Sequence, residues 1–480
     1  MPNKATLRAS QRARSSALDR MASCSSAAPP FDELAWREVL RQNSDPNVPS
    51  AQHLDPSAKA IVTSKVCAEL APSGRVRRWF RWAPAGFTVA AMATSTCSPN
   101  GASTRPRGEL TTMLTGVHGS WSEAGEELPE AAVSRPCAAL QERQLRLHDY
   151  CLPAARFEHA PPSETTWRRG VALIGNEAHT DNFHHFNRDM LFFARVFARG
   201  LLHKSEIANV IVTDHSDIVD WSAEHARVVL GPQLLRRTVF MPHRRGGVQP
   251  KKAALSNASM RSISASSSAS AARFVCFDAT VEKLVTDPVD RDDVAWLRAR
   301  AYAACDVPAA RDESKPRLLL LLLRGDTTLG DKPSTARQVV NGGELRATLA
   351  EYASELGLRL HATAFAAMSY CEQVRLAADS SILVGVHGQG ITNGQFMRDD
   401  GLVVELFHGG RRPYWRAFDN VGHQPLYLGA GRPYVAAPYA ESSCEMMRWK
   451  HAPECKSFVN ASRLVGLMRQ VRKRGLLHQQ

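Results

Sequence analysis

The chain has 480 residues, more than one hydrophobic core usually serves, so the sequence predicts two or more domains. Hydrophobic residues make up 44% of the chain, which is typical of a soluble globular protein. The 60 Lys and Arg residues against 47 Asp and Glu give a net charge of +13, which suits an anionic ligand such as a nucleotide but equally suits nucleic acid or a membrane surface.

Residues 1–150 are rich in Ala, Ser, Arg and Pro and show little sustained periodicity, which predicts a mostly disordered leader. Within the leader, residues 75–97 put a basic cluster before an Ala-rich apolar run that resembles the hydrophobic part of a signal peptide in the wrong place. No stretch reaches the roughly 18 apolar residues that a membrane span needs. Membrane association would therefore require an anchor that is not evident in this sequence.

A first domain is predicted over residues 151–312. Short apolar strands are expected at 171–175, 209–214, 238–242 and 273–279, with a helix from Phe183 to Phe197. Residues 243–272 are basic and Ser-rich and are predicted to form a surface insertion. Such a charge run usually marks an exposed loop, and the chain has no zinc-finger or helix-turn-helix spacing, so nucleic-acid binding is disfavoured.

A second alternating unit is predicted over residues 313–440, and a C-terminal extension with a helix over 441–480. Residues 317–325 are a continuous apolar run of strand length, as expected for a buried parallel strand. Further strands are expected at 358–363, 381–388 and 401–407, and helices at 342–356, 369–379 and 390–397. Strands that alternate with helices indicate an α/β fold with parallel sheets. Two such units predict two Rossmann-like domains facing a cleft, with ligands at the carboxyl ends of the strands.

The ten cysteines occur singly and never as C-x-x-C, which disfavours a structural zinc site. Cys444 and Cys455 flank a short polar segment and are a candidate disulfide, which would fit an oxidising compartment. Buried unpaired thiols fit the sequence equally well.

The run SSILVGVHGQGITNGQF places His387 at the carboxyl end of a buried strand, directly before a predicted short helix. Gly388 and Gly390 allow tight turning and close approach of the backbone, and the first N–H groups of the helix suit a phosphate. The pattern alone leaves open a plain glycine turn that the histidine merely caps.

Three ordered blocks resemble glycosyltransferase family 61, most strongly over residues 317–407 and more loosely over 170–430. The stretch CEQVRLAADSSILVGVHGQGITNGQFMRDDGLVVELF is similar to the family's helix, apolar strand, HGAG-Leu-Thr-Asn turn and final Glu-Leu strand. Arg324 and the segment ARQVVNGGEL are similar to the family's arginine and its R-x-I-x-N-x-x-E-L segment, and DNFHHFNRDMLF to its N-x-x-H block.

Several positions depart from the family's pattern. Gln389 replaces the usual Ala, and RDDG replaces a Pro-Gly segment. Counted from His184, Asn182 lies one position closer than the family asparagine, and Arg188 occupies the usual acidic position.

The resemblance implies an inverting transfer, which needs a general base for the acceptor proton and a cationic environment for the leaving nucleoside diphosphate. The residues expected to bind the donor are Arg324, Gly388, Gly390, Asn393 and Glu405, helped by His387. The guanidinium of Arg324 suits bidentate phosphate binding, with a surface ion pair as the alternative. Glu405 is expected to accept the ribose hydroxyls, or else to be buried beside an arginine. Asn393 is expected to cap the turn or to start the helix.

The catalytic base is expected on the helix that carries His184, His185 and Asp189. Spacing favours His185 with Asp189, because residues four apart share a helix face, whereas the family position favours His184. We therefore predict His184, Asp189 and His387 as the catalytic residues. No H-E-x-x-H motif or acidic cradle lies nearby, so neither a metal nor another cofactor is expected.

The sequence thus predicts an inverting glycosyltransferase that moves GlcNAc or xylose from a UDP-sugar to a hydroxyl of a glycoprotein or glycan. The resemblance also implies work in the endoplasmic reticulum or Golgi lumen. Two alternatives remain: a catalytically inactive nucleotide-sugar-binding homologue, suggested by Arg188, and a nucleic-acid-binding protein that uses the basic insertion.

Overall fold

The computed structural model divides the chain into two compact units, each described by itself. The structure describes residues 52–55, 60–70, 76–82, 157–158, 165–175, 177, 180, 182–212, 220–240, 273–283, 289–323, 328–329, 332–333, 338–365, 368–407, 423, 426–427, 430–438, 441–442 and 456–473. Of these, residues up to 283 belong to the N-terminal unit and residues from 289 to the C-terminal unit. The insertion 243–272, Arg324, Cys444 and Cys455 lie outside the described residues.

The N-terminal unit is built on one mixed sheet in the order β4-β3-β2-β8-β5-β6-β7, with β1 paired to β2. The strands are β1 (Gln52–Asp55), β2 (Ala60–Leu70), β3 (Val76–Trp82), β4 (Phe157–Glu158), β5 (Thr165–Gly175), β6 (Ile207–Val212), β7 (Thr238–Phe240) and β8 (Arg273–Lys283). Strands β7, β6, β5 and β8 are parallel neighbours. Their chain order reverses between β5 and β8, and such a reversal is where α/β sheets bind ligands.

Two helices connect the parallel strands of this sheet. Helix α5 (Phe183–Ala198) follows β5, and α6 (Asp220–Leu235) follows β6. Phe186, Met190 and Phe193 of α5 are completely buried, and their i, i+4, i+7 spacing forms the apolar stripe that packs a helix on a core. The predicted strands and helix of this region are therefore present. Helix α6 was not predicted, because Gly231 and Pro232 break its pattern with a kink.

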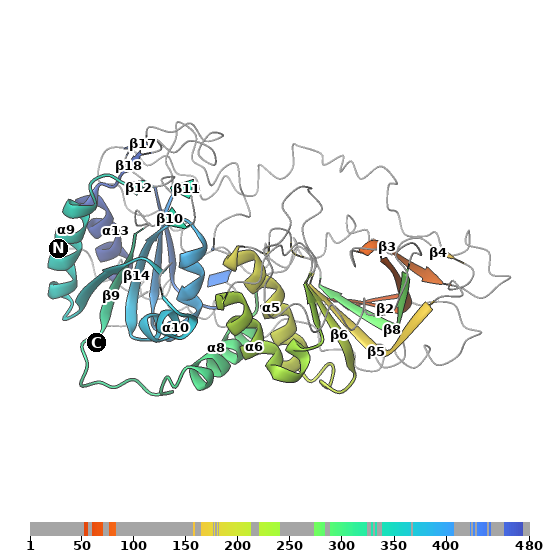
Figure 1. Cartoon of the computed structure of the whole chain (residues 1–480). Helices are drawn as coiled ribbons and strands as arrows, with labels where there is room; N and C mark the ends of the chain where they lie inside the picture. The colour runs from red at the N-terminus through yellow and green to blue at the C-terminus, as the bar shows by residue number, and fades with distance from the viewer. Residues whose placement is uncertain are drawn as a thin grey trace, which may run out of the picture. The chain divides into compact units, whose positions relative to one another are not determined.

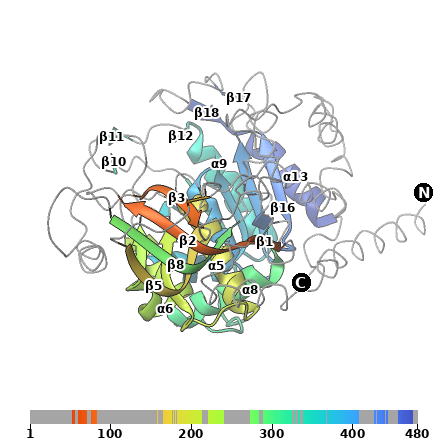
Figure 2. The same ribbon diagram turned by 90° about the vertical axis from the view of Figure 1, so that its right-hand side faces the viewer.

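Residues 52–82 depart from the prediction of a mostly disordered leader. Residues 52–55, 60–70 and 76–82 form β1, β2 and β3, and β2 pairs with β8 along its whole length, side by side in Figures 1 and 2. Val62 and Val66 are buried, and a disulfide joins Cys67 to Cys276, which face each other on the two strands. The segment AIVTSKVCAEL has strand propensity. It was missed because the prediction for residues 1–150 followed from their overall Ala- and Ser-rich composition.

The C-terminal unit holds a parallel sheet in the order β13-β9-β14-β15-β16. The strands are β9 (Leu318–Leu322), β13 (Arg359–Thr363), β14 (Ser380–Val386), β15 (Leu402–Phe407) and β16 (Tyr434–Pro438). All five leucines of β9 are buried, which confirms the buried parallel strand read from the apolar run. The chain order reverses between β9 and β14, so this sheet also has a switch point.

Helices cover this parallel sheet. They are α8 (Arg291–Ala304), α9 (Gly342–Glu355), α10 (Tyr370–Ala378), the 3-10 helix η7 (Gln389–Phe396) and α13 (Ala461–Lys473). Helices α9 and α13 lie together at one face (Figure 1), where Leu345, Leu349 and Met468 join the core. Short strands complete the unit: β10 (Thr328–Leu329), β11 (Lys332–Pro333), β12 (Gln338–Val339), β17 (Glu441–Ser442) and β18 (Lys456–Phe458).

Helix α8 belongs to the C-terminal unit, although the sequence predicted a boundary at residue 312. The Tyr302 hydroxyl donates a 2.6 Å hydrogen bond to the carbonyl of Phe396 in η7. A disulfide joins Cys305, at the end of α8, to Cys371 in α10. The predicted α/β fold with parallel sheets is confirmed, and the N-terminal sheet adds antiparallel strands that were not predicted. The arrangement of two domains facing a cleft stays a prediction.

The structure also describes part of the segment that resembles the hydrophobic part of a signal peptide. Strand β3, which pairs with β2, takes up residues 76–82 of the basic and Ala-rich segment 75–97. Within the described part of the chain, no helix is long and apolar enough to span a bilayer.

Candidate functional site

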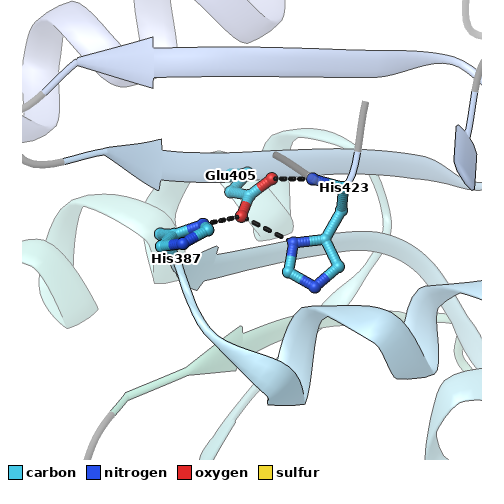
Figure 3. Close-up of side chains that lie close together, drawn as sticks. All are labelled: His387, Glu405 and His423. Carbon is cyan, nitrogen blue, oxygen red and sulfur yellow. Dashed lines mark hydrogen bonds and ion pairs between the residues drawn. The ribbon is translucent and has the colours of Figure 1, made fainter. Parts of the chain in front are cut away.

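His387, Glu405 and His423 form one hydrogen-bonded cluster in the C-terminal unit (Figure 3). Glu405 lies on β15, and His387 follows the last residue of its parallel neighbour β14. The His387 N–H donates to the carbonyl of Leu406 at 2.8 Å, so the histidine is held at the strand end by its backbone. Its Nδ1 lies 2.6 Å from Glu405 Oε1, and Nδ1 of His423 lies 2.8 Å from the same oxygen.

Glu405 is completely buried, and both of its oxygens are occupied by protein donors. Its Oε2 accepts hydrogen bonds from the His423 N–H at 3.2 Å and from the Tyr434 hydroxyl at 2.5 Å. The expected role of Glu405 in binding ribose hydroxyls is therefore wrong for this geometry, because a saturated, buried carboxylate has no acceptor capacity to offer a ligand. The alternative prediction, a buried and paired Glu405, agrees better with the structure. Its partners are histidines, however, and not an arginine.

The electrostatics fix the protonation state of this cluster. Burial alone would raise the pKa of Glu405, but His423 and His387 outweigh it and hold that pKa well below its ordinary value. Burial first, and then the Glu405 charge, raise the pKa of Tyr434 well above its ordinary value. An ionised carboxylate only accepts, so Nδ1 of His387 carries the proton and donates it to Glu405. The other ring nitrogen, Nε2, is directed away from the carboxylate.

The cluster is tied to the turn that follows β14. His423 Nε2 lies 3.0 Å from the Thr392 hydroxyl of η7. The buried Asn393 amide donates to Gln373 Oε1 at 3.0 Å and to the Gly390 carbonyl at 3.3 Å. Asn393 therefore braces the turn between α10 and η7 through its amide nitrogen, while its buried Oδ1 has no hydrogen-bond partner among the described residues.

The glycines of this turn have different structural roles. A Cβ on Gly385 would lie 2.6 Å from Ile391 Cδ1, so a side chain at this position would force Ile391 of η7 to move away from β14. A Cβ on Gly390 would meet its nearest neighbours, Phe365 and Leu322, only at 3.6 and 3.7 Å. Packing therefore does not require a glycine at position 390. Gly388 has an extended backbone, which residues other than glycine also adopt.

A second charged cluster lies at the switch point of the N-terminal sheet, where β5 and β8 end. Lys283, the last residue of β8, donates to Glu177 Oε2 at 2.7 Å and to Asp189 Oδ1 at 3.0 Å. All three side chains are buried. A Cβ on Gly175, the last residue of β5, would lie 2.5 Å from Asp189 Oδ2, so only glycine lets this carboxylate pack there.

Glu177 connects this buried cluster to partly exposed residues of α5. Its Oε1 accepts from Arg188 at 2.8 Å and lies 3.2 Å from Nδ1 of His185. Burial would raise the pKa of Glu177, but Lys283, His185 and Arg188 outweigh it and lower that pKa to about 2. Burial raises the pKa of Asp189, and the neighbouring Glu177 adds to the effect.

The structure changes the assignment of the predicted base. Asp189 is completely buried and ion-paired with Lys283, so it is not placed to take a proton from an acceptor. The N-x-x-H spacing is met by Asn182 and His185, and Asp189 then takes the acidic position four residues on. The prediction counted this block from His184; counted from His185, Arg188 no longer stands at the acidic position.

Sequence reasoning missed Glu177, Lys283, Thr392, His423 and Tyr434. The signal for Lys283 was present, because a charged residue at the end of an apolar strand is the same pattern that singled out His387. His423 and Tyr434 carry no such signal, since neither belongs to a motif and they come from a distant part of the chain.

His387, Glu405 and His423 could also offer ligands to a metal ion, since one atom from each lies within 4.8 Å of the others. Two histidines and a carboxylate are a known ligand set. Here both Nδ1 atoms lie at hydrogen-bond distance from one carboxylate oxygen. A metal ion would therefore have to replace both Nδ1 protons in order to bind.

Comparison with known proteins adds three findings. The family model described as Glycosyltransferase 61 matches residues 183–404. A solved structure of a dodecameric iron-containing heptosyltransferase, TibC, in complex with ADP-D-β-D-heptose, is 11% identical over 64% of this chain and 78% of that chain, with a TM-score of 0.27. A TM-score this low supports no conclusion about this chain. No curated protein matches the sequence.

Proposed function

We propose that this glycosyltransferase, whose residues 183–404 match the family model Glycosyltransferase 61, acts with inversion. It transfers GlcNAc or xylose from a UDP-sugar to a hydroxyl of a glycoprotein or glycan. The observation that supports this proposal most is the His387–Glu405 pair. It stands at the carboxyl end of β14, beside the point where the strand order of the sheet reverses.

The proposed reaction is a single displacement. The acceptor oxygen forms a bond to C1 of the sugar while the bond from C1 to the diphosphate oxygen breaks, and the acceptor proton passes to a base. UDP leaves with the bonding electrons. Stabilisation of the charge that develops on it is the largest contribution that a protein makes to such a step.

His387 is suited to that stabilisation. Glu405 fixes the proton on Nδ1, so the ring orientation is set before the donor binds. A protonated Nε2 would then donate to a diphosphate oxygen. Arg324 is the second cation we expect at the diphosphate, on the strength of its family position. The proposal needs no metal, because cationic side chains and backbone N–H groups supply the charge.

The disulfides support a proposal for the cellular compartment in which the protein works. Cys67–Cys276 and Cys305–Cys371 pair all four cysteines that the structure describes. Disulfides persist in oxidising environments such as the lumen of the secretory pathway. We therefore propose that the enzyme works in the endoplasmic reticulum or Golgi lumen.

A donor screen tests the function. The purified protein is incubated with UDP-GlcNAc, UDP-xylose and other UDP-sugars, with and without a panel of glycopeptide and oligosaccharide acceptors, and UDP release is measured. We expect acceptor-dependent release with at least one donor and binding of UDP by calorimetry. Absence of binding by UDP and by every UDP-sugar would overturn the proposal. Binding without release would indicate a nucleotide-sugar-binding protein.

A further inference from the structure

We propose that Asn460 carries an N-linked glycan, attached in the lumen of the secretory pathway. The proposal concerns a modification of the protein and goes beyond the reaction that it catalyses. It rests on the compartment proposed above, which the disulfides Cys67–Cys276 and Cys305–Cys371 support. It does not depend on which sugar or acceptor the enzyme uses.

The sequence that begins at Asn460 has the form that N-glycosylation requires. Residues 460–462 read Asn-Ala-Ser, an N-x-S triplet without proline in its middle position. The chain has one other such triplet, at residues 257–259, and this one lies outside the described residues. Triplets of this kind also arise by chance, so the structural setting of Asn460 decides whether a glycan fits there.

Asn460 is an exposed helix cap that a glycan would leave intact. It lies between β18 and α13, and both Asn460 and Ser462 are exposed. Its Oδ1 accepts from the Arg463 N–H at 2.9 Å, and its main-chain carbonyl accepts from the Leu464 N–H at 3.0 Å. A glycan is attached to Nδ2, so the oxygen that caps α13 is not consumed.

Exposed apolar side chains lie beside this position. Strands β12 and β18 pair in parallel (Figure 1), and the register that joins Val339 to Ser457 continues to Val340 and Phe458. Val340 is 53% exposed and Phe458 is 36% exposed. Among the residues that the structure describes, Trp167 is the one other large hydrophobic side chain that is exposed. Two of these three side chains therefore lie at one place.

Hydrogen bonds hold these apolar side chains close to the triplet. The Asn341 amide donates to the Val459 carbonyl at 2.7 Å, and the Val459 N–H donates to Asn341 Oδ1 at 3.0 Å. This pair of bonds joins the residue after Val340 to the residue before Asn460. Phe458 precedes Asn460 by two residues, so the first sugar of a glycan can lay its apolar C–H face on the Phe458 ring and shield it from water.

The donor of the glycan is a lipid-linked oligosaccharide diphosphate. The bond from C1 of its first sugar to the diphosphate oxygen breaks, and the lipid diphosphate leaves with the bonding electrons. Nδ2 of Asn460 forms the new bond to C1 and loses one proton to a base of the transferring enzyme. The modified side chain keeps its Oδ1 and one N–H, so the α13 cap retains its acceptor.

Mass spectrometry of the full chain tests the assignment. The chain is expressed behind a cleavable signal peptide in eukaryotic cells and recovered from the secretory pathway. Its tryptic peptide 457–463 is then measured before and after enzymatic removal of N-glycans in heavy-oxygen water. We expect this peptide to carry a glycan and to gain the heavy-oxygen label at Asn460. A recovered chain in which the peptide is unmodified overturns the proposal.

Substitutions in the two triplets separate the glycan from the helix cap. Ser462→Ala removes the triplet but keeps the Asn460 cap, and it should abolish the modification of peptide 457–463. Ser462→Thr, which preserves the triplet, should keep the modification. Asn257→Gln, in the other triplet, should leave this peptide modified as in the wild type. A glycan that persists at Asn460 in Ser462→Ala would contradict an N-linked attachment.

Thermal unfolding tests the contact with Phe458. Enzymatic removal of the glycan should lower the melting temperature of the wild type, and the shift should be smaller in Phe458→Ala. Trp167→Ala, which alters the exposed aromatic residue of the N-terminal unit, should show the wild-type shift. Equal shifts in Phe458→Ala and the wild type would overturn the contact.

The modification and the proposed function can fail separately. Ser462→Ala should release UDP at the wild-type rate, because it changes no residue of the candidate site. An unmodified chain that releases UDP would end the glycan proposal and leave the proposed function standing. A glycosylated chain that binds neither UDP nor any UDP-sugar would have the opposite meaning.

Discussion

His387 and Glu405 face each other from neighbouring parallel strands, with Nδ1 of the histidine 2.6 Å from Oε1 of the carboxylate. The register that pairs Gly385 with Glu405 places the carboxylate two residues before the end of β15 and the histidine just beyond β14. The pair is therefore a product of strand pairing.

Replacing His387 should reduce the transfer step. His387→Gln removes the cationic donor that we assign to the diphosphate, and we expect kcat to fall by about 10²–10³-fold with weaker UDP binding. UDP release and calorimetry measure the two effects. The exposed His203 offers a control, and His203→Gln should behave like the wild type. Unchanged UDP affinity and turnover in His387→Gln would remove this residue from the site.

The Tyr434 hydroxyl should contribute to stability through Glu405. Tyr434→Phe deletes a hydrogen bond to a buried ionised group, so we expect the free energy of unfolding to fall by about 1.5–3 kcal/mol. Tyr352 is also buried, but its hydroxyl has no hydrogen-bond partner among the described residues. Tyr352→Phe should therefore change stability by less than about 0.5 kcal/mol. Equal losses in urea unfolding would contradict the argument.

Two glycines of one motif should respond differently to alanine. Gly385→Ala places a methyl group 2.6 Å from Ile391 Cδ1, and such overpacking costs about 1–3 kcal/mol. Ile391→Val removes that carbon and should recover part of the loss. Gly390→Ala should leave the melting temperature nearly unchanged, because the nearest atom to the added methyl carbon would lie 3.6 Å away. If the donor approaches the backbone at Gly390, the same variant should lose UDP affinity in calorimetry.

The Cys305–Cys371 disulfide should stabilise the C-terminal unit. Its sequence separation is 66 residues, and closing a loop of that size stabilises a fold by about 2–4 kcal/mol. Cys305→Ala/Cys371→Ala should lower the melting temperature, and reductant should lower that of the wild type but have less effect on the variant. The same response to reductant in both proteins would show that this bridge contributes little.

The Glu177 cluster predicts a pH dependence of stability. The pKa of Glu177 is lowered from 4.5 to about 2, so its contribution is fully present above about pH 4.5 and is lost as the pH falls towards 2. Glu177→Gln should cost roughly 1–3 kcal/mol at pH 7, and the difference from the wild type should shrink below pH 4.5. Glu224, in an exposed ion pair with Arg227, is the control. A difference that stays constant from pH 7 to pH 3 would refute the prediction.

Most of the parallel strands could be predicted from the sequence, because each is a short, continuous run of apolar residues. The five leucines of β9 and the run before His387 are buried as their continuous apolar character indicates. Strand β2 was missed because its partner β8 lies more than 200 residues away and gives no local sign of the pairing.

The candidate site was predicted only in part for the same reason. His387 and Glu405 belong to one motif and meet as neighbours, but the carboxylate is saturated by His423 and Tyr434, which no motif connects to it. Likewise, Asp189 was taken for a base because its spacing on α5 was visible. Its neutralisation by Lys283 depends on a contact across 94 residues.

The pairing of β2 with β8 has a practical consequence for recombinant expression. A shortened protein that begins at the family-matched region would lack both β2 and β5, the two neighbours of β8, and would leave Cys276 without its disulfide partner. Bare edges of this kind recruit strands from other molecules and lead to aggregation. Production of a soluble, catalytically competent enzyme therefore calls for a start upstream of residue 52, even though β1, β2 and β3 carry none of the residues assigned to the candidate site.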